Sequence, residues 1–113
     1  MDCLFCRIAS QDIPTQIVFE NDTIIAFHDV NPQAPTHILV IPKKHISSMN
    51  HATIEDEALL GQLLLTAKNI AQKEGLTDSG YRLLFNTNQH GGQTVYHIHL
   101  HLLGGRQMTW PPG

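Results

Sequence analysis

The chain has 113 residues, a length that suits one compact domain and is short for two. Its hydrophobic content of 42% is typical of a globular protein, and no apolar run reaches the roughly 18 residues that span a bilayer. The net charge of -3, with neutral histidines, argues against a general nucleic-acid surface but permits a local site for a small anionic ligand.

The N-terminal segment predicts a short helical turn over the first dozen residues, ending before Ile13. It lacks a basic stretch followed by a long apolar run, so we expect no secretory signal and a cytoplasmic location. Both cysteines lie here, as Cys3 and Cys6. In a reducing cytoplasm this spacing is typical of half a metal site or of a redox pair. The redox interpretation requires a preceding strand, so we rank it below the metal site.

Three strands are predicted before residue 43. Residues 16–20 and 23–28 have strand character and are joined by the turn residues Asn21 and Asp22. A loop with two prolines follows at 31–35. Residues 37–41 form an apolar, β-branched run that is typical of a buried strand, which Pro42 ends.

One long helix is predicted over residues 54–74. Thr53 and Asp56 resemble a capping box at its start, and Gly75 suits the left-handed position after its end. Such a helix is about 30 Å long, enough to cross a small sheet. Its apolar stripe is expected to include Ile54, Ala58, Leu59, Leu65, Ile70 and Ala71.

Two further strands are predicted, at 81–85 and 95–103, with a loop at 86–93 between them and a tail at 104–113. Hairpin signals and one long helix together predict an α+β domain, an antiparallel sheet of about five strands with its helices on one side. We expect a single domain over residues 1–113.

The last predicted strand contains His97, His99 and His101 in alternation with aliphatic residues. Successive side chains of a strand point to opposite faces, so the three imidazoles should share one face at intervals of roughly 6 to 7 Å. Histidine moves protons, binds metals and attacks electrophiles near neutral pH. Three on one face are therefore expected to serve chemistry rather than packing alone.

Two chemistries remain open for this face. Histidines at i and i+2 can bind one zinc ion, although the outer pair would lie about 13 Å apart and carboxylates are scarce. Alternatively, the glycine-rich segment 91–94 can hold a phosphate through its N–H groups, with the hydroxyl of Thr94 and the amide of Gln93. A histidine could then attack phosphorus and form a phosphohistidine that water hydrolyses.

The chain resembles the histidine triad (HIT) superfamily over essentially its whole length, and within it the Hint branch. The resemblance is carried by residues 27–29, 32–37, 41–47, 91–93, 97–103 and 104–113. Hint proteins are nucleotide-binding proteins that act as purine nucleoside phosphoramidases. The resemblance implies the HIT-like fold, with a short N-terminal helix, and a homodimer in which the tail at 104–113 reaches the partner's active site.

The resemblance also implies roles for individual histidines. His99 matches the nucleophile that forms a nucleotidyl-histidine intermediate, and His101 matches the residue that contacts the α-phosphate. His97 would orient neighbouring groups, and His37 matches a fourth histidine that helps to position the nucleophile.

Other positions match residues that bind the ribose, the base or the phosphate, namely Asp29, Val30, Asn86, Gly92, Gln93 and Thr94. Asp29 has a second interpretation, because an Asp before a proline-rich loop is most often a turn residue that bonds its own backbone. At position 94 the family often has Ser; Thr keeps the hydroxyl and adds a methyl group.

Some relatives bind zinc through positions that match Cys3, Cys6, His45 and His97, a set suited to a tetrahedral structural site. Alternatively, the cysteines are ordinary small apolar residues and no metal binds.

The activity that the resemblance implies is cleavage of the P–N bond of a purine nucleoside 5′-phosphoramidate, with release of AMP or GMP. It requires no metal cofactor. Two alternatives remain: a dinucleoside polyphosphate hydrolase or nucleotidyl transferase of the same superfamily, and a nucleotide-binding interaction protein with incidental catalysis. Neither a nucleic acid nor a membrane is expected among the partners. No role is predicted for His28, His51 or His90.

Overall fold

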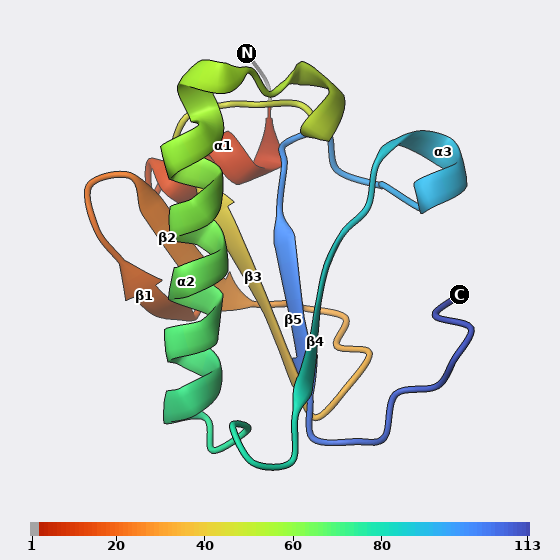
Figure 1. Ribbon diagram of the computed structural model, residues 1–113. Coiled ribbons are helices and arrows are strands. Elements are labelled where there is room, and N and C mark those ends of the chain that lie inside the picture. The colour runs from red at the N-terminus through yellow and green to blue at the C-terminus, as the bar shows by residue number, and fades with distance from the viewer. Residues whose placement is uncertain (1–2) are drawn as a thin grey trace.

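The computed structural model describes residues 3–113 and contains a five-stranded sheet flanked by helices (Figure 1). The elements in chain order are α1 (Leu4–Ala9), β1 (Ile17–Glu20), β2 (Ile24–His28), β3 (Thr36–Pro42), the 3-10 turns η1 (Met49–His51) and η2 (Ile54–Asp56), α2 (Glu57–Lys73), β4 (Tyr81–Phe85), α3 (Asn88–Gly91) and β5 (Leu100–Gly104). The strand order is β1-β2-β3-β5-β4, and each neighbouring pair is antiparallel. The α+β class, the five strands, the long helix and the short N-terminal helix are therefore confirmed.

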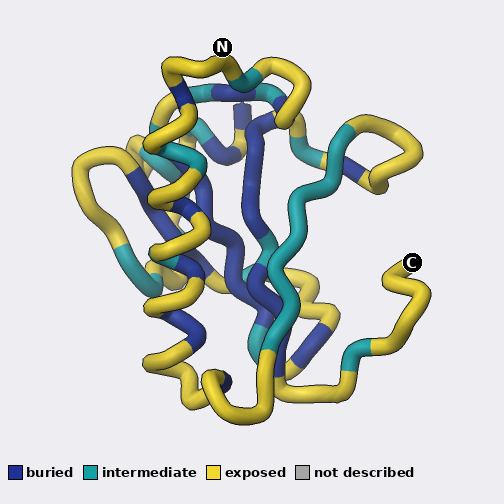
Figure 2. Tube along the Cα trace, viewed as in Figure 1, coloured by how far each residue is buried: buried dark blue, intermediate teal, exposed yellow. Residues whose placement is uncertain are grey.

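The sheet separates two apolar layers, and its central strands β2, β3 and β5 are buried over most of their length (Figure 2). On one face α2 packs Leu63 and Ala67 against the sheet. On the other face α1 packs Phe5 and Ile8 against it. The expectation that the helices lie on one side was wrong. Alternate residues of β2 and β3 are apolar on both faces, so each face needs a cover.

The long helix ends close to where it was expected, but its first three predicted residues form the 3-10 turn η2, and its buried stripe differs. Thr53 and Asp56 form the capping box in both directions, and Gly75 adopts a positive φ of 75°. The stripe consists of Leu63, Ala67, Ile70 and Ala71, which share one helical face. Three residues expected in the stripe lie on the opposite face and are exposed, namely Ile54, Ala58 and Leu65.

The last strand is shorter than predicted. β5 pairs with β3 and β4 only from Leu100 onwards: β4 ends at Phe85, opposite that residue, and the pairing with β3 reaches no further than Val40. Segment 95–99 therefore lies outside the sheet, although Ile98 donates its N–H to the Ile46 carbonyl at 2.6 Å. The loop predicted at 86–93 contains the short helix α3, which the sequence pattern did not indicate.

Within residues 3–113, no helix combines the length and the apolar character needed to cross a membrane.

Candidate active site

His99 and His101 line a cavity of about 360 Å³ on the α1 face of the sheet. Its volume lies within the range of small-molecule sites, about 300 to 1,000 Å³. The apolar walls come from α1, from Ile13 and Pro14 and from the sheet. Besides the histidines, the polar groups include Thr15, Asp29 and Thr94. The cavity thus combines an apolar interior with a few convergent polar groups.

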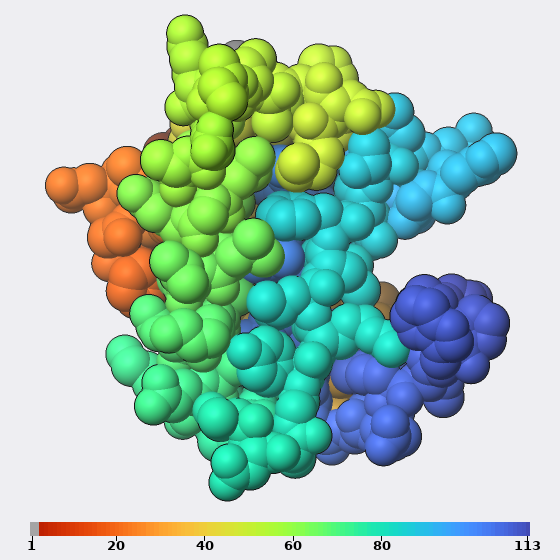
Figure 3. All heavy atoms as spheres, viewed as in Figure 1, coloured from red at the N-terminus to blue at the C-terminus, as the bar shows by residue number. Residues whose placement is uncertain are grey.

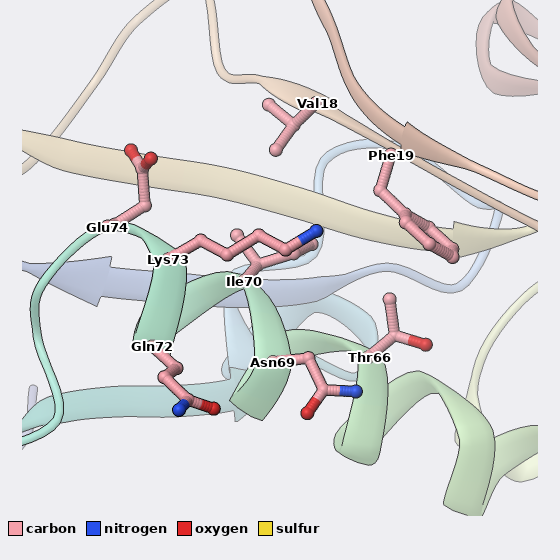
Figure 4. A pocket seen from close by; sticks show the side chains of 8 residues that line it. All are labelled: Val18, Phe19, Thr66, Asn69, Ile70, Gln72, Lys73 and Glu74. Atoms are coloured by element: carbon pink, nitrogen blue, oxygen red, sulfur yellow. The ribbon is translucent and has the colours of Figure 1, made fainter.

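A second cavity, of about 610 Å³, lies between β1 and α2 on the opposite face (Figure 4). Its walls include Phe19, Ile70 and Lys73, and none of the residues that line it is a histidine or cysteine. The chemistry of the described residues therefore concentrates on the α1 face.

A chain of hydrogen bonds fixes the proton positions on two histidines. The N–H of Gln33 donates to His37 Nδ1 at 3.0 Å, so neutral His37 carries its proton on Nε2. That Nε2 lies 2.9 Å from His101 Nδ1 and donates to it. Neutral His101 then carries its own proton on Nε2, which is buried and lacks a partner among the described residues. The result is an imidazole N–H available to a ligand in the cavity.

His99 presents a hydrogen-bond acceptor to the cavity, whereas His101 presents a donor. Its Nδ1 donates to the main-chain carbonyl of His97 at 2.8 Å, so the lone pair remains on Nε2. The His99 ring lies 4.9 Å from the His101 ring and meets the edge of Phe5 at 5.0 Å, measured between ring centroids. The site therefore places a nucleophilic nitrogen beside a hydrogen-bond donor.

Burial keeps these imidazoles neutral. It lowers the pKa of His101 to about 4, assisted by the neighbouring His99 and His37. Burial likewise lowers the pKa of His99 and of His37, against the opposing effect of the Asp29 carboxylate. At pH 7 the donor and acceptor pattern of the hydrogen-bond chain is therefore the stable one.

Asp29 forms the backbone turn expected of it, and it also faces the cavity. One carboxylate oxygen accepts the N–H of Asn31 at 2.8 Å, which forms a turn, and the other lies 3.4 Å from His37 Nε2. Asp29 also lines the cavity, as does the neighbouring Val30, which is 97% exposed. Both residues are thus positioned to meet a ligand.

The loop before the histidines departs from expectation. The N–H groups of Gly92 and Gln93 are already bonded, to the carbonyls of Gln89 and Asn88, because α3 closes a helical turn there. The anion-binding loop expected from these two N–H groups is therefore not preformed. Neither residue lines the cavity, and neither does Asn86.

The Gln93 side chain acts as a structural tie. Its oxygen accepts the N–H of Asn88 at 3.0 Å, and its Nε2 donates to the carbonyls of Ser47 and Val95 at 2.7 and 3.1 Å. Of the predicted positions in this loop, only Thr94 lines the cavity.

Cys3, Cys6, His45 and His97 form a second cluster, whose potential ligand atoms all lie within 4.8 Å of one another. The two His Nδ1 atoms are 3.2 Å apart. His97 Nδ1 lies 3.5 Å from the Sγ atoms of both Cys3 and Cys6, and His45 Nδ1 lies 3.3 Å from Cys6 Sγ. Tetrahedral zinc with ordinary bond lengths requires about 3.3 Å between nitrogens and about 3.5 Å between sulfur and nitrogen. The cluster thus has the dimensions of a Cys2His2 zinc site.

The hydrogen bonding of His97 supports a ligand role. Its Nε2 donates to the carbonyl of Pro42 at 2.8 Å, which leaves the Nδ1 lone pair facing the thiols. Burial lowers the pKa of His97 and so favours its neutral, ligating form. Burial also raises the pKa of the Cys6 thiol, and a bound cation would oppose that shift.

Two residues of the site were not singled out from the sequence. Gln33 acts through its main-chain N–H, for which its side-chain identity carries no signal. Phe5 lies between the cysteines and was indistinguishable from a core residue. Of the histidines left without a role, His28 lines the cavity, His51 bonds Ser48, and His90 lies exposed on α3.

Comparison with known proteins adds independent information. The HIT domain family model matches residues 10–108. The purine nucleoside phosphoramidase of Escherichia coli (strain K12) is 50% identical over 107 residues, which cover 95% of this chain and 90% of that protein. An uncharacterized HIT-like protein of Synechococcus elongatus is 59% identical over 112 residues, 99% of this chain and 97% of that one.

Solved structures agree with this result. A HIT family hydrolase from Legionella pneumophila matches with a TM-score of 0.98 and 62% identity, covering 99% of this chain and 100% of that chain. A histidine triad protein from Clostridium difficile matches with a TM-score of 0.93 and 39% identity, covering 96% and 95%.

Proposed function

The chain belongs to the HIT domain family, and from that premise we propose that it hydrolyses the P–N bond of purine nucleoside 5′-phosphoramidates. The observation that carries the proposal is the opposite polarity of two adjacent imidazoles: His99 presents a lone pair and His101 presents an N–H in the same cavity. A phosphoryl group needs both, a nucleophile for phosphorus and a donor for its oxygens.

In the proposed first step, His99 Nε2 attacks the α-phosphorus while His101 Nε2–H donates to a phosphoryl oxygen. The P–N bond breaks, and the amine leaves with the bonding electron pair and takes a proton from solvent. The nucleoside monophosphoryl group is then attached to His99. In the second step water adds its hydroxyl to phosphorus, releases its other proton to solvent and frees the nucleoside monophosphate and His99.

The rest of the cavity suits a nucleoside. The carboxylate of Asp29 can accept hydrogen bonds from both ribose hydroxyls, and the exposed Val30 can cover one side of a purine base. Thr94 offers its hydroxyl near the phosphate. We assign Asn86, Gly92 and Gln93 to the same site through the shape of their loop, which the side chain of Gln93 and the main-chain N–H of Gly92 hold in place.

We further propose that zinc binds at Cys3, Cys6, His45 and His97 and has a structural role, because those residues match a tetrahedral site in dimensions and donor type. A bound zinc ion would supply a fixed joint between the N-terminal turn and the segment that carries the histidines. The hydrolysis described above uses no metal.

We also propose a homodimer. β4 is an edge strand of the sheet, and such strands are commonly covered by a partner. The tail at 104–113 and α3 both project beyond β4, which suits a tail that reaches a second subunit (Figure 3). A size measurement in solution tests this; a monomer at micromolar concentration would contradict it.

The central test is a rapid-quench reaction with an adenosine 5′-phosphoramidate labelled in the nucleotide. We expect an acid-labile adduct on His99 within the first turnover. His99→Ala should abolish the adduct and lower turnover by about 10³-fold or more while AMP still binds. Turnover without an adduct, or an active His99→Ala, would overturn the mechanism.

The same purified protein distinguishes the proposed function from its two alternatives. A dinucleoside polyphosphate hydrolase would turn over diadenosine polyphosphates faster than the phosphoramidate. For an interaction protein with incidental catalysis, a cellular phenotype would survive His99→Ala and be lost when the cavity is filled.

A further inference from the structure

Helix α1 contributes to two sites at once. Cys3 caps its N-terminus, with Sγ accepting the N–H of Cys6 at 3.4 Å, and both thiols face the cluster with the two histidines. The same helix supplies Leu4, Phe5 and Ile8 to the wall of the nucleotide cavity. One helix of six residues therefore contributes to both a candidate metal site and a candidate nucleotide site.

His97 forms a second connection between the sites. The side chain of His97 belongs to the cysteine and histidine cluster. Its main-chain carbonyl accepts the ring Nδ1–H of His99 and so leaves the lone pair of the nucleophile on Nε2. Any shift of His97 that accompanies binding in the cluster reaches His99 through this hydrogen bond, 2.8 Å long.

Phe5 lies between the sites. Its ring meets His97 edge-on with centroids 6.1 Å apart, and meets His99 edge-on with centroids 5.0 Å apart. A third edge contact, with Phe27 at 5.5 Å, seats it on the sheet. Phe5 is 5% exposed, so it has little room to move independently of these rings.

A third cavity, of about 490 Å³, borders the cluster and is lined by Cys3 and His45. It shares Leu4, Thr94 and Val95 with the nucleotide cavity. The cluster is thus accessible to an ion, and one set of side chains separates the two spaces.

A helix of six residues does not hold its shape or position by itself. The position of α1 depends on apolar packing against the sheet and on what its two thiols bind. A ligand that orders α1 from either side therefore lowers the entropic cost of binding on the other side.

We propose that a metal ion in the cluster and a nucleotide in the cavity strengthen each other's binding, with Phe5 as the positioning residue that couples them. This inference rests on the proposed nucleotide site. Coupling between binding sites is reciprocal, so the factor by which metal raises nucleotide affinity must equal the factor by which nucleotide raises metal affinity.

The test uses AMP and Zn²⁺ as the two probes. AMP affinity is measured by calorimetry on metal-free and zinc-loaded protein, and zinc affinity by competition with a chelating dye, with and without saturating AMP. A dye titration with AMP and no protein corrects for zinc bound by AMP itself. We expect both measurements to give one factor, of about five-fold or more.

Two matched variants locate the coupling. Phe5→Leu keeps all four ligands but should clearly lower the factor, with the remainder passing through His97, whereas Phe19→Leu makes the same change on the opposite face and should retain the full factor. Where metal-free protein does not fold, the dye measurement on these two variants decides, because both lose stability but only Phe5→Leu lowers the factor.

Each failure has a distinct meaning. Equal AMP affinity with and without zinc, or no zinc binding, overturns the coupling and leaves the nucleotide site standing. No AMP binding in either form overturns the nucleotide site and with it the proposed function. A full factor in Phe5→Leu overturns the role of Phe5.

Discussion

Lowering the pH from 7 to 5 should reduce the free energy of unfolding, and part of that loss should come from His101. Burial lowers the pKa of His101 from 6.5 to about 4 in the folded state. Between these two values the unfolded chain binds a proton at His101 that the folded chain does not. Stability contributed by this group is therefore lost as the pH falls from 6.5 towards 4. For the interval from pH 7 to pH 5, the loss is about 2 kcal/mol.

The assay is urea unfolding of wild-type protein and of His101→Gln at both pH values. Glutamine can still accept the N–H of His37 through its amide oxygen, but it does not titrate. The variant should therefore lose about 2 kcal/mol less than the wild type between pH 7 and pH 5. Contributions from the cysteine and histidine cluster are common to both proteins and cancel.

Equal pH dependence in the two proteins would refute the reasoning. An independent check is the NMR titration of the His101 ring in the folded protein, which should show a midpoint at about 4. A midpoint near 6.5 would mean that burial does not hold His101 neutral.

Further expectations concern packing and ligand contact. Leu63→Ala removes a fully buried side chain beneath α2 and should lower the free energy of unfolding by about 2 to 5 kcal/mol, measured in urea. Gly104→Ala would place a Cβ 2.6 Å from Leu76 Cδ1 and should cost about 1 to 3 kcal/mol, whereas the matched change Gly61→Ala meets nothing within 4 Å and should stabilise α2 by about 0.5 to 1 kcal/mol. Val30→Ser should leave stability within about 0.5 kcal/mol because the side chain is 97% exposed, yet weaken AMP binding about three- to ten-fold in calorimetry; unchanged AMP affinity would remove Val30 from the site.

The elements of this fold follow closely from local sequence. The capping box at Thr53 and Asp56 and the glycine at 75 mark the ends of the long helix because they satisfy backbone groups within a few residues. The paired strands β1 and β2 follow from two segments of strand character joined by a short turn. These signals act between residues that are close together in the sequence.

The assignment of faces could not be made in this way. Both surfaces of β2 and β3 are apolar, and nothing in that pattern states which helix covers which surface. The start of β5 at Leu100 was also hidden, because it depends on where its pairing with β3 and β4 begins. Pairing is a property of two strands, whereas a hydrophobic pattern describes one.

The candidate site shows the same difference between what local sequence and tertiary structure determine. The sequence by itself determined that His99 and His101 share one face of the chain, since both line the same cavity while Leu100, between them, lies in the core on the other face. Only the tertiary structure decided which nitrogen of each ring carries the proton. That choice depends on the main-chain N–H of Gln33 and the main-chain carbonyl of His97. Such backbone groups are common to nearly all residues, and only the folded structure positions these two beside the rings.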